Sequence, residues 1–343
     1  MEKQRIEYID YLKGFSILLV VIGHFVSRNF TIAGAETRYQ LFDFIYSFHM
    51  PLFMFLGGYT AYYSLSKPGT DFGRFILKRT LSLLIPYFIW SLFIGNFLSG
   101  NFKIELSYLK ETLNLLTIEY RGLWFLPTIW FLSIILVSHE TILKKIQKNN
   151  LLIKSLFLSI ITLSILLVIY KLTNLKFIQS AISYYIPFYI GVMLVKFDVI
   201  KKLFDKTSII TICCFVFLIC GLSFTEGKHD MYNSIMRLSA GVTSLPVFFY
   251  LFKNNSLPDK VKQQLSFFGK NTLVIYIVSG SMLSTGITID NLSPFWMFFT
   301  NLLFSIIICN ACSIISRIVA FIPSLDFIVF GRNKISSQKK LSK

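Results

Sequence analysis

Charged side chains are scarce in this sequence. Only 15% of its 343 residues are Asp, Glu, Lys or Arg, whereas 54% are hydrophobic and 36 residues are Phe. A soluble domain of this length would carry roughly 25% charged residues. The shortage argues against a soluble domain and predicts a protein that crosses a membrane several times.

Several motifs of catalytic and metal sites are absent. The sequence contains no Gly-rich phosphate loop, no nucleophile elbow and no HExxH segment. The cysteines, all in apolar runs and without metal-ligand spacing, are Cys213, Cys214, Cys220, Cys309 and Cys312. We interpret them as small buried hydrophobic residues, and we expect neither a metal site nor a tightly bound cofactor.

Acidic residues are half as numerous as basic ones, 17 against 34, which gives a formal net charge of +17. In a soluble protein this excess would suggest a nucleic-acid partner. Here the apolar runs change the interpretation, because runs on the order of 20 residues can cross the hydrocarbon core. Such runs lie near residues 10–28, 44–64, 80–99, 123–142, 151–170, 179–196, 207–225, 233–252, 271–289 and 295–322.

The basic residues follow the predicted spans. With a cytoplasmic N-terminus, 23 of the 34 Lys and Arg fall in cytoplasmic segments and nine in outer loops, as the positive-inside rule requires. We therefore predict an all-α integral membrane protein with about ten transmembrane helices and both termini in the cytoplasm. It would comprise a single membrane domain, residues 1–330, and a basic cytoplasmic tail, 331–343. The net charge then reflects topology, and no nucleic-acid partner is expected.

Two further segments need an interpretation. The small residues "AGA" at 33–35 follow an apolar run, as in a signal peptide, but Arg28 intervenes and Asp10 and Lys13 dilute the run. We expect an uncleaved first span. The outer segment 100–122 is the longest polar interruption, and its leucine spacing predicts an amphipathic helix on the outer surface.

The first span, "YIDYLKGFSILLVVIGHF", carries three ionisable residues, Asp10, Lys13 and His24. Lys13 and His24 are separated by about 16 Å of helical rise and only ~20° of rotation, and Asp10 lies about 40° from His24, so all three share a face. In one interpretation the three residues are structural: Lys13 extends to the membrane interface, and His24 forms a hydrogen bond with a neighbouring helix. We favour a functional site on this face, because ionisable groups inside a membrane usually serve function and an uncharged imidazole can act as a general base.

Later spans offer weaker candidates. His49 stands in "FIYSFHMPLFMFLGGY" and is either an interfacial histidine or part of a site. Arg79, in "RFILKRTLSLLIPYFIW", suits a positive-inside anchor as well as a phosphate ligand. In "EYRGLWFLPTIWFL", Trp124 and Trp130 are compatible with an ordinary aromatic belt.

These segments, followed by "YIPFYIGVML" and "FGKNTLVIYIV", resemble the membrane-bound acyltransferase family 3, and within it the sugar O-acetylases. The resemblance covers most of the chain and is strongest over residues 6–130. It implies a cell-membrane enzyme that transfers an acetyl group from cytoplasmic acetyl-CoA to a hydroxyl of a cell-surface or lipid-linked carbohydrate. Its expected partners are acetyl-CoA as co-substrate, the carbohydrate acceptor and the lipid bilayer.

The resemblance also implies residue roles. His24 would be catalytic, as the general base, with Asp10 supporting it, and Lys13 and Arg79 would bind the CoA phosphates. The residues that would shape the acceptor site are His49, Arg121 and Trp124.

Two positions depart from the family pattern. The family often has a second basic residue in the turn after Arg79, where this chain has Ser82 and Leu83, so the phosphate grip is not fully standard. It often has a histidine three residues after Tyr276, where this chain has Ser279, so a helper histidine is absent or is supplied by His49.

Two other classes of function remain open on the sequence. In a transporter or flippase of a glycan precursor or small solute, the polar stripe would be a substrate or proton path. We find no inverted repeat that would favour it. A non-catalytic assembly protein that retains the same scaffold is the third possibility.

Overall fold

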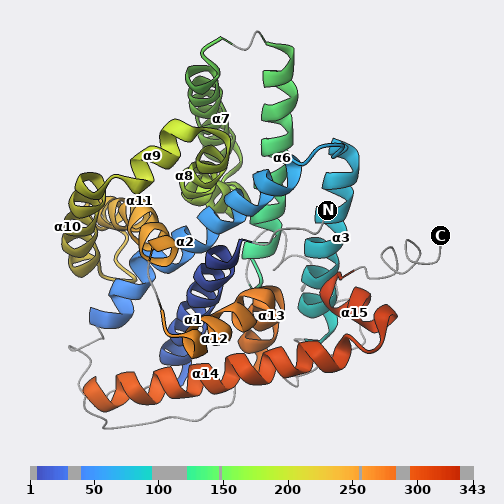
Figure 1. Cartoon of the computed structure of the whole chain (residues 1–343), viewed down its shortest axis with the longest axis vertical. Helices are drawn as coiled ribbons and strands as arrows, with labels where there is room; N and C mark the ends of the chain where they lie inside the picture. Colours follow the sequence, from blue (N-terminus) through green and yellow to red (C-terminus); the bar gives the residue numbers. More distant parts are fainter. Residues whose placement is uncertain are drawn as a thin grey trace. The chain divides into compact units, whose positions relative to one another are not determined.

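The computed structural model of the chain describes residues 6–29, 40–94, 122–146, 149–254, 257–282 and 294–332. Every regular element in these ranges is helical, as the apolar runs predicted (Figure 1). The elements are α1 (Glu7–Asn29), α2 (Gln40–Leu65), α3 (Phe72–Ile89), the short π-helix η1 (Trp90–Ile94), α6 (Phe125–Lys145), α7 (Leu151–Thr173), α8 (Lys176–Lys196), α9 (Asp198–Asp205), α10 (Thr207–Ser223), α11 (Met231–Asn254), α12 (Asp259–Lys270), α13 (Thr272–Met282), α14 (Pro294–Val319) and α15 (Pro323–Phe330).

The chain is a multi-pass membrane protein. Within the described ranges, eight helices are long and apolar enough to cross a membrane: α1, α2, α3 with η1, α6, α7, α8, α11 and α14. The predicted span 207–225 corresponds to α10, which meets α9 at a bend of 70°, and this bent pair is a ninth candidate. The predicted span 271–289 begins as α13, and residues 283–289 lie outside the described ranges. So do most of the predicted surface segment 100–122 and most of the tail 331–343.

The helices form two compact units. The first comprises Met1–Leu56 and Val199–Ile318, and the second comprises Gly57–Asp198 and Val319–Lys343. The first unit therefore contains α1, the beginning of α2, nearly all of α9 and the helices from α10 to α14. The second contains the end of α2, α3, η1, α6, α7, α8 and α15.

In the first unit, α12 lies alongside the N-terminal half of α1 (Figure 1), and two glycines allow this contact. A Cβ atom on Gly14 would stand 2.0 Å from the Leu265 carbonyl oxygen, and one on Gly269 would stand 2.0 Å from the Asp10 carbonyl oxygen. No side chain fits at either position, so backbone meets backbone as in other close helix pairs of membrane proteins. The contact fixes α12 beside the polar residues of α1.

Aromatic rings fill the space between α2, α10 and α11 in the first unit. Phe48 stacks on Phe248 with ring centroids 5.0 Å apart, and Phe217 contacts both Phe44 and Phe48 at 5.1 and 5.0 Å. This use of phenylalanine accounts for part of its abundance in the sequence, because large rigid rings bury much apolar surface. Of the cysteines, Cys220, Cys309 and Cys312 are buried as expected, and the pair at 213–214 is half-buried.

The second unit is held by similar close contacts and by specific hydrogen bonds. A Cβ atom on Gly58 would stand 1.9 Å from the Phe188 carbonyl oxygen, so α2 and α8 touch through their backbones. The Trp130 indole donates to the Thr80 hydroxyl at 2.9 Å and joins α6 to α3. The Trp90 indole donates to the Val329 carbonyl oxygen at 2.9 Å and joins η1 to α15.

The second unit also contains a buried ion pair at the ends of α6 and α8. Lys196, which the topology counted as a cytoplasmic loop cation, is 6% exposed and pairs with Glu140. His139 precedes Glu140 and hydrogen-bonds through Nε2 with the Thr162 hydroxyl at 2.8 Å. A cation at the end of a span can therefore be a buried structural group, and its place in the sequence alone did not indicate this.

Candidate active site

The polar stripe predicted on the first span lies on α1. This helix runs without interruption from Glu7 to Asn29, so the predicted spacing holds along it. Asp10 is buried, with 4% of its surface exposed, and Lys13 and His24 are half-buried. The helix therefore carries a carboxylate and a cation toward one end and an imidazole about 16 Å beyond the cation.

Near His24, α1 packs closely against α2. A Cβ atom on Gly23 would stand 2.6 Å from the Tyr46 ring, so this glycine lets the tyrosine lie against the helix beside His24. The Tyr46 ring in turn contacts the His49 ring, with centroids 4.7 Å apart. The two histidines that the sequence singled out thus belong to one cluster, with Tyr46 between the helices.

The hydrogen bonding of His49 decides which ring nitrogen is available. Its Nδ1 lies 2.8 Å from the Ile45 carbonyl oxygen, and His49 is 4% exposed. A carbonyl oxygen only accepts, so Nδ1 carries the proton and donates it. In the neutral ring, Nε2 then keeps its lone pair and can accept a hydrogen bond from a ligand or a neighbour.

Helix α14 supports this part of α1. The Asn301 side-chain amide, which is buried, donates to the Ile22 carbonyl oxygen at 3.4 Å, and Ser305 donates to Asn301 Oδ1 at 3.2 Å. The Phe304 ring stacks on Phe25 with centroids 5.4 Å apart. These contacts join residues 279 positions apart, so no local pattern in the sequence indicates them.

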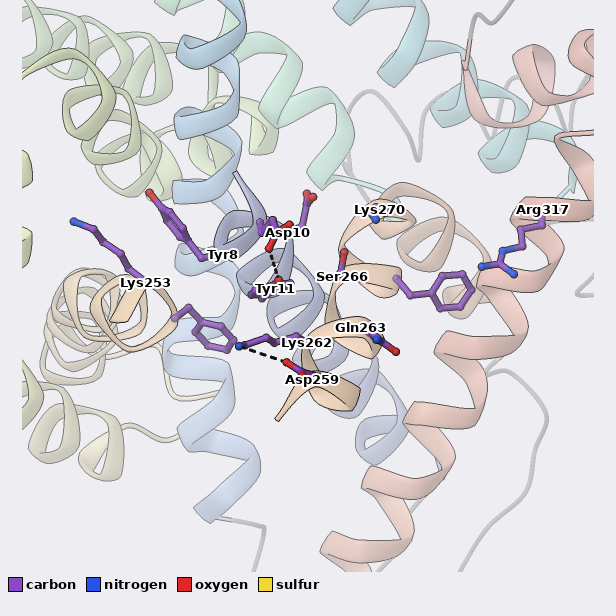
Figure 2. A pocket seen from close by; sticks show the side chains of 13 residues that line it. Tyr8, Asp10, Tyr11, Lys253, Asp259, Lys262, Gln263, Ser266, Lys270 and Arg317 are labelled. Atoms are coloured by element: carbon purple, nitrogen blue, oxygen red, sulfur yellow. Dashed lines mark hydrogen bonds and ion pairs between the residues drawn. The ribbon is translucent and has the colours of Figure 1, made fainter. Parts of the chain in front are cut away.

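At the opposite end of α1, the one predicted to face the cytoplasm, the first unit contains a cavity of about 890 Å³. Figure 2 shows side chains from α1, α12 and α14 directed into it. Its polar lining is made by Glu7, Tyr8, Asp10, Tyr11, Lys253, Asp259, Lys262, Gln263, Ser266, Lys270 and Arg317. Residues at the ends of α1, α11 and α14 therefore meet around one cavity.

The cavity carries charges of both signs. Lys253 pairs with Asp205 at 2.6 and 2.7 Å, and Lys262 lies 3.8 Å from Asp259. The Arg317 guanidinium stands over the Phe267 ring, 4.5 Å from its centroid. Such a lining provides donors for anionic groups and acceptors for amino and hydroxyl groups.

The cavity includes one predicted site residue and several that the sequence did not single out. Asp10 lines it directly, and Lys13 lies one helical turn beyond Asp10 toward His24. The additional residues of α12 are Lys262, Gln263, Ser266 and Lys270. The segment "DKVKQQLSFFGK" lies between the predicted spans 233–252 and 271–289. Its apolar residues recur with helical spacing, which is the pattern that could have predicted α12.

The other predicted residues lie in the second unit or outside the described residues. In the second unit, the Arg79 guanidinium stands over the Phe75 ring of its own helix at 5.4 Å, and Trp124 stacks on Tyr184 with centroids 5.2 Å apart. Arg121 lies outside the described residues. Ser279, at the position where the family often has a histidine, is buried, and no described residue forms a hydrogen bond with its hydroxyl.

Comparison with known protein families supports the interpretation of α1. Residues 6–317 match the profile of the family described as acyltransferase domain. The chain belongs to acyltransferase family 3. The match covers α1 to nearly the end of α14, and so includes the histidine cluster and the cavity of Figure 2. A multi-pass membrane acyltransferase accordingly fits both the sequence and the fold.

Two curated relatives are similar over shorter segments. The nodulation protein NolL of Sinorhizobium fredii is 38% identical over 88 residues, which are 24% of this chain and 22% of the relative. The nodulation protein NolL of Mesorhizobium japonicum is 30% identical over 141 residues, 40% of this chain and 36% of the relative. The chain thus matches only about a fifth to a third of each relative's length. No solved structure matches the chain.

Proposed function

We propose that the protein is a membrane O-acetyltransferase that moves an acetyl group from cytoplasmic acetyl-CoA to a carbohydrate hydroxyl. The membership in an acyltransferase family supports the reaction class. The acetyl donor, the carbohydrate acceptor and the residue roles below belong to the proposal. The cell membrane is its proposed location, with the cavity of Figure 2 open to the cytoplasm.

One observation carries this proposal: a single unbroken helix connects a polar cavity with a cluster of two histidines. Asp10 lines the cavity, and His24 follows fourteen residues later, about 21 Å along the axis of α1. Acetyl-CoA has phosphates and an adenine at one end and the thioester at the end of a long flexible arm. A donor held by its nucleotide in the cavity would extend its arm along α1 toward the imidazole.

The lining of the cavity suits the nucleotide end of this donor. Lys262, Lys270 and Arg317 supply cations for phosphate groups. The carboxylates of Glu7 and Asp10 supply acceptors for an exocyclic amino group or ribose hydroxyls. By the family pattern, Lys13 would also bind the phosphates, and it lies one turn along α1 from the cavity residue Asp10. The phosphate role of Arg79, in the second unit, remains a prediction from that pattern.

The chemistry requires one proton acceptor beside the reacting hydroxyl. The His24 imidazole takes the proton of the sugar hydroxyl while its oxygen attacks the thioester carbonyl. The carbon–sulfur bond then breaks, and the departing CoA thiolate takes the proton from the imidazolium. His49, whose Nε2 can accept a hydrogen bond, is assigned to the acceptor side. The roles of Arg121 and Trp124 remain predictions from the family pattern. Asp10 lies too far along the helix to touch the imidazole and acts at the donor end.

The decisive experiment is a transfer assay with purified protein in lipid nanodiscs. We expect His24→Ala to lower acetyl transfer from radiolabelled acetyl-CoA to extracted cell-surface glycan by about 10²- to 10⁴-fold, the usual contribution of a general base. The protein should keep its normal abundance in the membrane. The matched control is His139→Ala. It removes a buried imidazole of the second unit, and this variant should retain transfer.

The same assay separates the proposal from its rivals. Equal transfer by wild type and His24→Ala would contradict the assigned base. An absence of transfer by the wild type, together with glycan movement into sealed vesicles, would support a transporter or flippase. An absence of both would support a non-catalytic assembly protein.

A further inference from the structure

At the end of α1 and α2 opposite the donor cavity, the segment between α10 and α11 encloses a small second cavity. Its volume is about 70 Å³, room for about five water molecules. Phe224, Glu226, His229, Asn233 and Arg237 are among the residues that line it. The topology places this segment on the outer side of the membrane.

The segment is ordered by the Asn233 side chain. Its amide nitrogen donates to the carbonyl oxygens of Thr225 and Lys228, at 2.6 and 2.9 Å, and its oxygen accepts the Thr225 backbone N–H at 2.9 Å. Asp230 accepts the Asn233 backbone N–H at 2.6 Å. Asn233 is only 3% exposed. The cavity is thus built on a fixed backbone, which is what a recognition site needs to bind without a large ordering cost.

The cavity is linked to the histidine cluster of the active site. The Glu226 backbone N–H donates to Asp43 Oδ1 of α2 at 3.2 Å. Asp43 precedes His49 by six residues, about 9 Å of helical rise. The segment that lines the cavity is therefore attached to α2 about 9 Å along the helix axis from His49.

One polar atom of the lining has no hydrogen-bond donor among the described residues. Glu226 Oε2 is buried, and no described residue donates a hydrogen bond to it. A buried carboxylate oxygen without a donor is costly, so a hydroxyl that reaches it gains a strong bond. The Arg237 guanidinium lies over the Phe224 ring, 5.9 Å from its centroid, and combines a donor with an apolar plate. Acceptors and donors beside an aromatic ring suit hydroxyl groups, whereas Glu226 would repel a phosphate.

We propose that this cavity binds the carbohydrate acceptor, holding a hydroxyl-bearing edge of the sugar so that another hydroxyl faces the histidine cluster. The inference rests on the proposed function, because it names the residues that select the acceptor for the same reaction. The volume fits an edge of one sugar ring, with the rest of the glycan outside. Glu226 accepts hydrogen bonds from sugar hydroxyls, and Arg237 and His229 donate hydrogen bonds to hydroxyl oxygens.

Steady-state kinetics of Glu226→Gln test this inference. The acceptor probe is unacetylated glycan extracted from cells in which the gene has been deleted, and acetyl-CoA is the donor. We expect the KM for the glycan to rise at least fivefold, because the amide replaces an anionic acceptor. The KM for acetyl-CoA and the slow hydrolysis of acetyl-CoA without glycan should stay within twofold of wild type.

Asp230→Asn is the matched control. It removes a carboxylate from the same segment, and Asp230 is exposed and serves as a cap for Asn233. Its KM for the glycan should change less than twofold. An unchanged KM in Glu226→Gln, or an equal rise in both variants, would overturn the acceptor site and leave the proposed function intact. Absence of transfer by the wild type would instead remove the proposed function and this inference with it.

Discussion

The two ends of the first unit differ in how their cavities are made. The donor cavity, about 890 Å³, is enclosed by residues from α1, α11, α12 and α14, which are far apart in the sequence. The outer cavity, about 70 Å³, is enclosed almost entirely by one short segment between α10 and α11. One end therefore depends on the packing of several helices, and the other on the internal hydrogen bonds of a loop.

This difference suits two different demands on an acyltransferase. A donor that is always the same large molecule benefits from a site fixed by the helical core. A binding site on a loop can change its side chains more easily, because loops change without disturbing the packing beneath them. We therefore propose that residues of α1 and α12 determine which donor binds, and that residues 224–237 determine which sugar binds.

Gly14→Ala is expected to have the largest effect, because it disrupts the helix packing on which the donor cavity depends. The added methyl would stand 2.0 Å from the Leu265 carbonyl oxygen, and backbone cannot yield as a side chain does. Overpacking of this kind costs about 1–3 kcal/mol or more. We expect a lower melting temperature in detergent and loss of acetyl-CoA binding, measured by fluorescence-detected size exclusion and by calorimetry.

Gly280→Ala in α13 is the control for that change, since among the described residues no atom lies within 4 Å of its added methyl. It should leave the melting temperature unchanged or slightly raised, because alanine favours a helix. Should Gly14→Ala keep both stability and donor binding, α12 would not be fixed against α1 as described.

A smaller effect should follow from Lys262→Gln, which acts on the donor end alone. Loss of one charge-assisted hydrogen bond, about 1.5 kcal/mol, predicts a roughly tenfold rise in the KM for acetyl-CoA. The KM for the glycan should not change, which is the reverse of the pattern for Glu226→Gln. Lys260→Gln is the matched control on the same helix, because Lys260 is exposed and the cavity is lined by Lys262. An equal rise in both variants would indicate only a general effect of charge.

Much of the helical layout and the polar face of α1 was predictable from sequence. The apolar runs marked the spans, and the interval between Lys13 and His24 placed both on one face because an uninterrupted helix has a fixed repeat. The proximity of His49 to His24 was left as a possibility. It depends on Gly23 and Tyr46, and a glycine in an apolar run does not reveal which ring it will contact.

Three features of the structure could not be predicted from the sequence, each for a physical reason. The amphipathic helix α12 is short and lies between two spans, so its lysines were counted as loop charges. The loop around Asn233 owes its form to hydrogen bonds between backbone and a single side chain, which no periodicity announces. The buried pair of Lys196 and Glu140 joins residues 56 positions apart. Each depends on tertiary contacts, whereas span prediction rests on local hydropathy.

The central claim is that α1 carries the acyl donor from the inner cavity to His24. A cryo-electron microscopy structure with a non-transferable thioether analogue of acetyl-CoA tests it most directly. We expect the nucleotide of the analogue to bind among Lys262, Lys270 and Arg317, with the acyl group beside the His24 imidazole. A nucleotide bound outside this cavity, or an acyl group remote from His24, would contradict it.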